Sequence, residues 1–209
     1  MRVGVVAEYR KRGAAEVNQA IAKAADALGV LGARIGEVSL PLAELAPSLS
    51  MALGDPESAA RESRDPKVLA TLDAGFRQRI AASSLLPSAL HQRALQARGL
   101  LYRELIAAFG RFDVLISPCA PTAAPKIATV TRPITSAEEA HRAMFAGFPF
   151  TMLYSLAGAP AISVPCGFTK DGLPIGLQMA AKPFDEATLF RAAYAYEQVS
   201  PARGLGPAM

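Results

Sequence analysis

The side chains of this 209-residue sequence that could act as nucleophiles or bases are few and lie far apart. Ser83 and Ser84 are adjacent, but they lack flanking glycines and fit the end of a helix. Lys126 follows a proline-rich loop, where a solvated charge is expected, and neither His91 nor His141 has an evident nucleophile within a recognisable motif. A nucleophile must have its base within hydrogen-bond reach. We therefore predict no catalytic residue in this chain.

The two cysteines, Cys119 and Cys166, are far apart in the sequence and have no metal-ligating neighbours. A zinc site normally places several cysteine or histidine ligands at short, regular spacings. We therefore expect two buried free thiols in a reducing compartment rather than a disulfide or a zinc site. No metal or cofactor is expected.

The composition, with 51% hydrophobic residues, allows a sizeable core. No uncharged apolar stretch reaches the roughly 18 residues that indicate a membrane span, and the charges of MRVGVVAEYRKRG follow its apolar run, the reverse of a secretory signal. We therefore expect a cytoplasmic protein that does not associate with membranes.

The formal net charge is only +4, and the single tight basic cluster is RKR at residues 10–12. A nucleic-acid-binding surface normally needs a denser set of basic side chains. We expect no nucleic-acid partner and a solvated loop at residues 10–12, with a direct phosphate contact as the alternative.

The first forty or so residues have the pattern of a parallel α/β unit. Residues 2–7 are short, β-branched and apolar, which predicts a strand. Apolar residues then recur at helical spacing from Ala15, and Gly29 and Gly32 lie near the expected helix end. Residues 33–41 predict a second strand that Pro41 closes.

A mostly helical section follows. We expect loops and short helical pieces over residues 41–66, a helix over 65–84 that Pro66 starts, and a longer helix over 87–110. Arg98 falls on the apolar stripe of that longer helix. It either reaches solvent along its aliphatic stem or meets a buried acceptor.

Residues 112–118 (FDVLISP) are a continuous apolar run, which predicts a strand buried on both faces. The proline-punctuated loop that follows leaves the carboxyl end of this strand, where ligands bind in open α/β sheets. The capping-box pattern at residues 136–139 then predicts the start of a helix.

The segment LAGAPAISVPCGFTKDGLPIGLQM predicts a hairpin of two apolar strands, residues 161–165 and 173–179. Asp171-Gly172 between them fits a two-residue type I′ turn, in which both central residues need positive φ. Asp185 caps a last helix. The sequence thus predicts an α/β fold with a mixed, mostly parallel sheet flanked by helices over residues 1–199, and a loose tail over 200–209.

The run LAGAPAISVPCGFTKDGLPIGLQMAAKPFDEATLFRAAYAYEQ closely resembles the C-terminal end of amidase signature enzymes. This family includes general amidases, allophanate-type hydrolases and the A subunit of glutamyl-tRNA(Gln) amidotransferase. FDVLISPCAPTAAP and MRVGVVAEY resemble earlier family segments in the same order, so the resemblance covers nearly the whole chain. It implies the C-terminal half of an amidase-signature sandwich.

The resemblance also implies where the chemistry comes from. The family uses a serine nucleophile, a bridging serine and a lysine base, with oxyanion donors from a glycine- and serine-rich loop. These motifs precede the region that this chain resembles. The chain is therefore expected to supply sheet and substrate pocket to an amidase acting on linear amides, to be inactive alone, and to pair with a complementing amino-terminal half or with a second copy of itself.

Five residues are expected, from the resemblance, to bind a small amide substrate: Arg79, Phe148, Phe150, Thr151 and Tyr154. Arg79 matches an arginine of the amidotransferase that holds the glutamine carboxylate, and this role suits a guanidinium; a helix-surface arginine is the alternative. Phe148 stands where the amidotransferase has an acidic residue for the substrate amino group, which favours a less polar or differently charged amide. The last three residues lie on the approach to the hairpin, where packing explains the two aromatics equally well.

Two further functions remain open: a non-catalytic remnant or partner-binding protein, and a chain like the A subunit of the amidotransferase. A dinucleotide-binding domain is suggested by the first strand and helix, but only Gly13 follows that strand and the glycine fingerprint is absent. If the family's sheet is cut in this chain, an unpaired strand edge and an apolar face are exposed. We then expect the chain to dimerise, aggregate or capture a complement.

Overall fold

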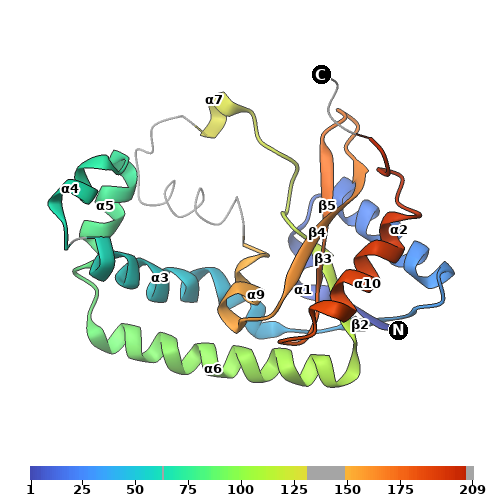
Figure 1. Cartoon of the computed structure of the whole chain (residues 1–209), viewed down its shortest axis with the longest axis horizontal. Coiled ribbons are helices and arrows are strands. Elements are labelled where there is room, and N and C mark those ends of the chain that lie inside the picture. The colour runs from blue at the N-terminus through green and yellow to red at the C-terminus, as the bar shows by residue number, and fades with distance from the viewer. Residues whose placement is uncertain (63, 131–148, 206–209) are drawn as a thin grey trace.

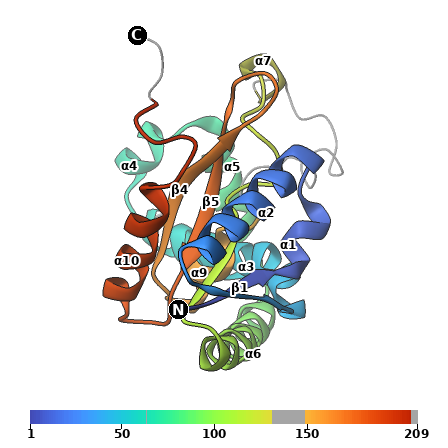
Figure 2. The ribbon, with the colours of Figure 1, turned by 90° about the vertical axis from the view of Figure 1, so that its right-hand side faces the viewer.

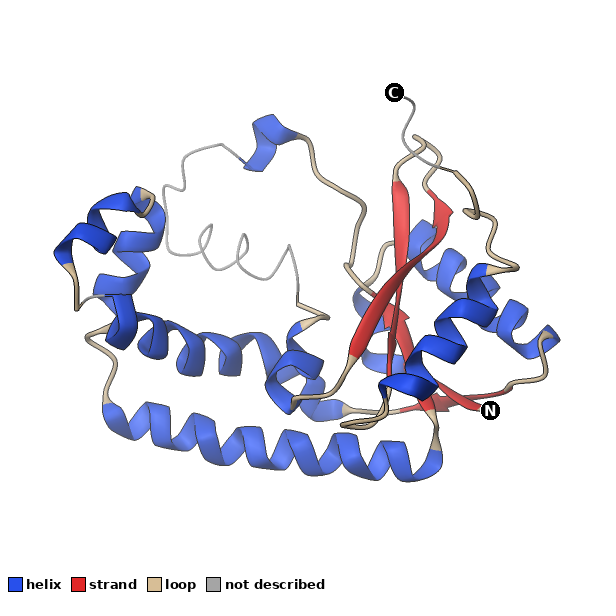
Figure 3. Ribbon diagram, in the orientation of Figure 1, coloured by secondary structure: helices blue, strands red, loops and turns tan. Residues whose placement is uncertain are grey.

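Five strands in the described part of the chain form one mixed sheet in the order β2-β1-β3-β5-β4. The strands are drawn in red in Figure 3. The computed structural model describes residues 1–62, 64–130 and 149–205. β1 is parallel to both of its neighbours, while β5 is antiparallel to both β3 and β4, so β5 alone runs against the other strands. The expected mixed, mostly parallel sheet flanked by helices is confirmed. The strands are β1 (Arg2–Val6), β2 (Arg34–Val38), β3 (Val114–Pro118), β4 (Ala161–Phe168) and β5 (Pro174–Ala180).

Helices cover the two faces of this sheet (Figure 1). One face is covered by α2 (Ala15–Val30) and α10 (Glu186–Glu197), which lie in front of the sheet in Figure 2. The other face packs against the remaining helices of the core: α1 (Ala7–Arg12), the 3₁₀ helix η1 (Pro41–Leu45), α3 (Ala46–Glu62), α6 (Ser88–Arg111) and α9 (Met152–Ala157). Two hydrophobic cores result, one on each side of the sheet.

β3 lies in the centre of the sheet and is buried along its whole length, as its continuous apolar run predicts. Because successive side chains of a strand point to opposite faces, Val114 and Ile116 enter the core beneath α2 and α10. Leu115 enters the core on the other face, and Ser117 therefore points to that face too. This alternation places the first polar side chain of β3 below α9.

The predicted first crossover unit is confirmed. The apolar stripe of α2 is buried against the sheet, and Gly32 follows the helix with a φ of 88°, a backbone conformation that glycine adopts without strain. β1 and β2 then pair in parallel register from Arg2 opposite Arg34 to Val6 opposite Val38.

The helical section differs from expectation in two places. Residues 41–62 form η1 and a continuous 17-residue α3, not loops and short pieces, although Pro56 lies inside the helix. Burial of Leu49 and Leu53 on one side of α3 offsets the cost of that proline, because tertiary packing supplies most helix stability.

The single helix expected over 65–84 is two helices, α4 (Pro66–Thr71) and α5 (Ala74–Ser83). Asp73 starts the second helix by accepting a 2.9 Å hydrogen bond from Phe76 N.

α6 confirms the predicted long helix, and together with α3 it carries α4 and α5 away from the sheet (Figure 1). α7 (Ile127–Val130) follows the proline-punctuated loop after β3.

The basic cluster at residues 10–12 lies in α1 rather than in the expected loop. α1 continues directly from β1 and buries Tyr9. Arg10 Nη1 lies 3.6 Å from Glu37 Oε2.

The hairpin is confirmed, but its predicted type I′ turn is wrong. Gly172 has a φ of 79°, whereas Asp171 does not have positive φ. Gly172 N donates to Thr169 O at 3.0 Å, and Thr169 N donates to Leu173 O at 2.8 Å. These bonds define a three-residue loop, Lys170 to Gly172, that needs glycine only at its last position.

Pro165 was expected either to end the first strand of the hairpin or to lie where no strand hydrogen bond is needed, and it does not end the strand. β4 continues through an irregularity between Pro165 and Gly167 and ends at Phe168. β4 is an edge strand, where a residue without an N–H is tolerated. The predicted helix that begins at residues 136–139 lies outside the described residues.

Residues 200–205 pack against the hairpin. Ser200 and Ala202 are buried, and Ser200 Oγ donates to Pro165 O at 2.7 Å. Residues 206–209 lie outside the described part, and the domain boundary at residue 199 stays a prediction.

Candidate functional site

A polar row crosses the three strands β3, β5 and β4 on the face that carries α9. Ser117 pairs directly with Gln178, which pairs directly with Ser163. Paired residues of neighbouring strands present their side chains on the same face of a sheet. Ser117 Oγ donates to Gln178 Oε1 at 3.3 Å. Polar groups from three strands therefore meet on an otherwise apolar surface.

A cavity of about 340 Å³ lies over this row. Its volume falls at the small end of the roughly 300–1,000 Å³ typical of ligand pockets. Strands β4 and β5 form its floor, the residue after β3 and the start of α9 form its walls, and its lining residues are Cys119, Thr151, Tyr154, Ser155, Ala159, Ala161, Ile162, Ser163 and Gln178. We call it the α9 cavity.

Cys119 joins the floor of the α9 cavity to its wall. Its backbone N donates to Gly176 O at 3.0 Å, and its Sγ donates to Ser163 Oγ at 3.0 Å. Burial raises the pKa of the Cys119 thiol, with the Ser163 hydroxyl opposing the shift. A thiol with a raised pKa is a poor nucleophile at neutral pH, so Cys119 shapes the cavity rather than reacting in it.

Gly176 is required for this close approach. A Cβ at residue 176 would lie 2.9 Å from Ser163 Oγ and 3.1 Å from Cys119 Sγ. Any side chain there would force the Ser163 and Cys119 side chains to move at the cavity floor. Gly176 therefore allows these two side chains to approach each other as closely as they do.

α9 is held in place by a hydrogen bond and by an aromatic stack, and a glycine ends it. Arg98 of α6 donates from Nε to Leu156 O at 2.6 Å. Of the two alternatives expected for Arg98, solvent exposure or a protein acceptor, its guanidinium therefore has a protein acceptor. Phe150, just before α9, is fully buried and stacks on Tyr9 with ring centroids 4.3 Å apart. Gly158 ends the helix with a φ of 65°.

Tyr154 of α9 lines the cavity and is only 1% exposed. Among the described residues its hydroxyl has no hydrogen bond of normal geometry, and the Ser117 side chain is the polar group that interacts with it. Burial raises the pKa of this phenol, so it stays protonated. A buried hydroxyl without a well-formed hydrogen bond costs folding free energy. Because Tyr154 lines the α9 cavity, its hydroxyl is placed where a bound molecule could accept that hydrogen bond.

The structure brings only some of the predicted substrate-binding residues together. Thr151 and Tyr154 line the α9 cavity, while Phe150 packs beneath α9 and does not line it. Arg79 lies on α5, at the end of α3 away from α9 (Figure 1), and its Nη2 is 2.5 Å from Asp55 Oδ1. Phe148 lies outside the described residues. The substrate-binding roles of all five stay predictions.

Sequence reasoning missed Cys119, Ser163 and Gln178 as cavity residues. The available signal was a polar residue inside each of two apolar strands and a cysteine two residues after Ser117. Only the strand register shows that these polar residues meet, because Ser117 and Gln178, for example, are 61 residues apart in the chain.

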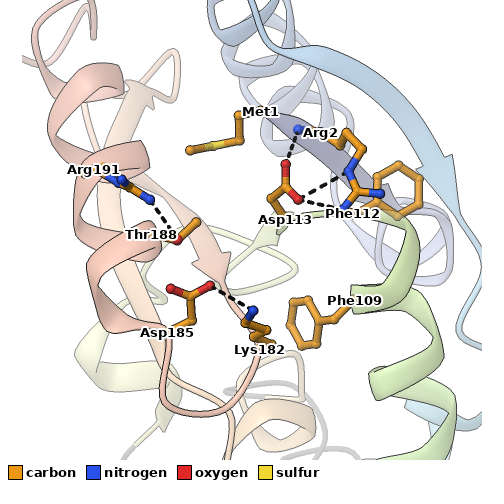
Figure 4. A pocket seen from close by; sticks show the side chains of 9 residues that line it. All are labelled: Met1, Arg2, Phe109, Phe112, Asp113, Lys182, Asp185, Thr188 and Arg191. Carbon is orange, nitrogen blue, oxygen red and sulfur yellow. Dashed lines mark hydrogen bonds and ion pairs between the residues drawn. The ribbon is translucent and has the colours of Figure 1, made fainter.

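A second cavity, of about 430 Å³, lies at the rim of the sheet where β1 begins and β5 ends (Figure 4). Arg2 Nη2 is 2.7 Å from Asp113 Oδ1, and Lys182 Nζ is 3.7 Å from Asp185 Oδ2. The hydrogen bonds from Arg2 lower the pKa of Asp113. The Arg2–Asp113 pair ties β1 to the start of β3, and the Lys182–Asp185 pair is local to the segment before α10, which favours a structural role for this rim.

No charged side chain of the described residues lines the α9 cavity. All six lysines of the sequence, each within the described residues, are exposed. The described part of the chain contains no group of three or more His, Cys, Asp or Glu side chains suited to a metal ion. None of the helices described is long and apolar enough to cross a membrane.

The Amidase family model matches residues 1–190. Among curated relatives, the glutamyl-tRNA(Gln) amidotransferase A subunit of Listeria monocytogenes is 36% identical over 225 residues, covering 95% of this chain and 45% of that protein. The protein of the same name from Geobacillus stearothermophilus is 36% identical over 227 residues, covering 96% of this chain and 45% of that protein. The chain thus spans less than half the length of these relatives.

Solved structures agree with these matches. The glutamyl-tRNA(Gln) amidotransferase A subunit of Thermotoga maritima has a TM-score of 0.79 at 27% identity, covering 99% of this chain and 44% of that one. A crystal structure of an amidase has a TM-score of 0.80 at 25% identity, covering 95% and 45%. A 6-aminohexanoate cyclic dimer hydrolase has a TM-score of 0.84 at 21% identity, covering 99% and 46%, which shows likeness of fold alone.

Proposed function

This chain belongs to the amidase family, and from that premise we propose that it is the C-terminal segment of an amide hydrolase. In this proposal it supplies the sheet and one wall of the substrate cavity, while the reactive serines and the lysine base come from outside its residues. The residues that it contributes to that wall include the predicted Thr151 and Tyr154.

The observation that carries the proposal is the exposure of every lysine in the sequence. A lysine acts as a base at neutral pH only when burial or neighbouring cations keep it uncharged. None of the six lysines is buried, whereas the polar groups that the described residues present to the α9 cavity are neutral hydroxyl, thiol and amide groups. This supports a cavity that binds substrate and receives its nucleophile from elsewhere.

The reaction would be acyl transfer from an amide to a serine, release of ammonia or an amine, and hydrolysis of the acyl-enzyme. The part played by this chain is positioning, because correct placement of a bound amide lowers the barrier without any chemistry from the wall. Arg98 and Gly176 keep that wall in shape by holding α9 and the cavity floor in position.

The proposal is tested by complementation. The purified chain is incubated with simple carboxamides, alone and together with a separately produced amino-terminal half of a related amidase, and ammonia release is measured. We expect activity only in the mixture. Ammonia release by the chain alone would contradict the assignment of the reactive residues to another segment.

A matched pair of variants shows whether the α9 cavity is the site used. Ser163→Trp fills the cavity from β4, and Gln19→Trp places the same side chain on an exposed position of α2, on the other face of the sheet. We expect the first variant to abolish activity in the mixture and the second to retain it. Equal activity of the two variants would remove the α9 cavity from the proposal.

We propose the complementing amino-terminal half, rather than a second copy, as the partner. β4 is an edge strand, and Ala161, Ser163 and Pro165 are exposed on the face that carries the cavity. Exposed, partly polar side chains beside a cavity suit a partner that completes the site.

We further propose that residues 1–199 form the domain. The two free cysteines support a cytoplasmic location.

A chain like the A subunit of the amidotransferase is the second candidate, which the names of the curated relatives favour. Glutamine would then be the amide hydrolysed in the complementation assay. Rapid ammonia release from glutamine, with little from simple carboxamides, would select this candidate.

A further inference from the structure

We infer that the open edge of β2 is an interface for a second copy of this chain, in which the two β2 strands pair antiparallel about a two-fold axis at Gly36. The strand order places β2 at one edge of the sheet and β4 at the other. The amino-terminal half proposed above as a partner belongs to the β4 side. The inference about β2 therefore goes beyond the proposed function and does not depend on it.

The backbone of β2 presents unpaired hydrogen-bonding groups at this edge. Arg34 N donates to Met1 O at 2.8 Å and so points toward β1. Because the backbone groups of successive strand residues point alternately to the two sides, those of Ile35 and Glu37 point away from β1. Both residues are exposed, and among the described strands only β1 pairs with β2. Each of the two residues thus offers an N–H and a C=O to a further strand.

These backbone groups are complementary to those of a second β2. When Gly36 lies opposite Gly36 of the second copy, Ile35 lies opposite Glu37 of the second copy, and Glu37 opposite its Ile35. Such opposite residues exchange both of their hydrogen bonds, so this register pairs every outward group of the two residues. The two glycines form a non-hydrogen-bonded pair, whose Cα atoms approach to about 4.5 Å, and neither has a side chain that opposes this approach.

The side chains at the β2 edge suit the same arrangement. Ile35 is 40% exposed and lies against the C-terminal end of α2, where Val30 and Leu31 are 90% and 46% exposed. A second copy would cover part of this apolar surface. Glu37 lies opposite an isoleucine rather than another carboxylate, and Arg10 Nη1 is 3.6 Å from Glu37 Oε2. No like charges are therefore placed directly opposite each other.

The other edge of the sheet is less suited to backbone pairing. Pro165 of β4 has no N–H, and the β4 register is irregular between Pro165 and Gly167. Prolines and irregularities of this kind protect an edge strand from pairing. β2 contains no proline, and its register with β1 is regular from Arg34 to Val38. Association through the exposed side chains of β4 would be a separate event at the opposite edge.

Amide hydrogen exchange, followed by NMR in dilute and concentrated samples, tests the inference on the chain itself. The outward amides of Ile35 and Glu37 should exchange about tenfold or more slowly in the concentrated sample. The amide of Gly36 points toward β1 and should not change, which makes it the internal control. Unchanged exchange at Ile35 and Glu37 would overturn the inference. Slowing by an added amino-terminal half, but not by concentration, would overturn it too and assign the edge to that half.

Disulfide formation between separate chains tests the register. Ile35→Cys on one chain and Glu37→Cys on the other lie opposite each other, with Cα atoms about 5.5 Å apart, a distance that a disulfide spans. Arg34→Cys is the matched control, because Arg34 is also exposed but its side chain lies on the other face of the sheet from Glu37. Peptide mapping after oxidation should find the disulfide between residues 35 and 37 and none between residues 34 and 37. Equal yields of the two would contradict the inferred pairing.

Two charge-matched variants complete the test. Ile35→Glu places a carboxylate opposite Glu37 of the second copy, where like charges destabilise the pair. Gln19→Glu adds the same charge to an exposed position of α2. We expect the first variant to lose the concentration-dependent slowing at Glu37 and the second to keep it, with ammonia release in the complementation assay unchanged in both. Equal slowing in the two variants would reject the β2 interface and leave the hydrolase proposal standing.

Discussion

At the scale of single residues, the α9 cavity depends on contacts that leave little room for substitution. Gly176 lies between Ser163 and Cys119, and those two side chains are themselves joined by a 3.0 Å hydrogen bond. Elsewhere, Glu8 accepts hydrogen bonds from Ser39 Oγ at 2.7 Å and Leu40 N at 2.8 Å. The contacts around Gly176 shape the cavity floor. The hydrogen bonds to Glu8 hold the chain in place between β2 and η1.

Replacing Gly176 with alanine should destabilise the protein by about 1–3 kcal/mol, because the new Cβ would lie 2.9 Å from Ser163 Oγ and force the Ser163 and Cys119 side chains to move. Gly110→Ala is the control: nothing lies within 4 Å of its added Cβ, and alanine favours helices. Urea unfolding measures both free energies. Equal effects of the two substitutions would contradict the contact assigned to Gly176.

Glu8→Gln should make stability less dependent on pH in the acid range. Burial alone would raise the pKa of Glu8, but the hydrogen bonds from Leu40 and Ser39 outweigh it and leave the pKa below the ordinary carboxyl value. A lowered folded-state pKa gives stability that is present above the unfolded pKa and is lost as pH falls through the folded one. We expect Glu8→Gln to cost about 1–3 kcal/mol near neutral pH and progressively less in acid.

Glu104 provides a control of opposite sign. Burial raises its pKa, with the hydrogen bond from Leu42 N opposing the shift. Its contribution is therefore present below the unfolded pKa and is lost as pH rises through the folded one. Urea unfolding across pH should show the cost of Glu104→Gln falling as pH rises, whereas a parallel trend for both variants would refute these assignments.

At the scale of secondary-structure elements, the hairpin shows how one residue decides a turn. The loop from Lys170 to Gly172 places only its glycine in the left-handed region, and Thr169 Oγ1 accepts a further bond from Leu173 N at 3.1 Å. β4 and β5 are therefore aligned by a loop that tolerates side chains at its first two positions. That alignment brings Ser163 opposite Gln178.

Gly172→Ala should destabilise the protein by about 1–2 kcal/mol, because a residue with a Cβ is strained at a φ of 79°. Asp171→Ala should cost less than about 0.5 kcal/mol, since no positive φ is needed there. Thermal unfolding distinguishes the two. A large cost for both substitutions would indicate the type I′ turn instead.

At the scale of the whole molecule, the sheet is covered unevenly. α2 and α10 bury one face, whereas β4 at the sheet edge leaves Ala161, Ser163 and Pro165 exposed on the other. An open strand edge with exposed side chains is a site for association with another chain. The tendency to dimerise, aggregate or capture a complement stays a prediction, and this surface is where we expect the association.

Ala161→Lys should weaken self-association by about tenfold or more, since a charge on an edge strand opposes strand pairing. Gln19→Lys adds the same charge to an exposed position of α2 and should have no effect. Sedimentation velocity over a range of concentrations measures both. A monodisperse monomer of the unsubstituted chain at high concentration would reject self-association altogether.

The sequence by itself determined the family, the mixed sheet flanked by helices, and most strands and long helices, because hydrophobic periodicity and turn residues act locally. It also pointed to Thr151 and Tyr154, which line the α9 cavity. It failed for α3 and the hairpin turn, where burial of Leu49 and Leu53 and the backbone of Gly172 outweigh local preference.

Only the tertiary structure decided which polar residues meet. Ser117, Gln178 and Ser163 come from three strands, and nothing local to any of them specifies the register that aligns them. The same holds for Arg98, whose acceptor lies 58 residues away on α9. Contacts between distant segments are fixed by the packing of the whole sheet and its helices, which a pattern read along the chain does not contain.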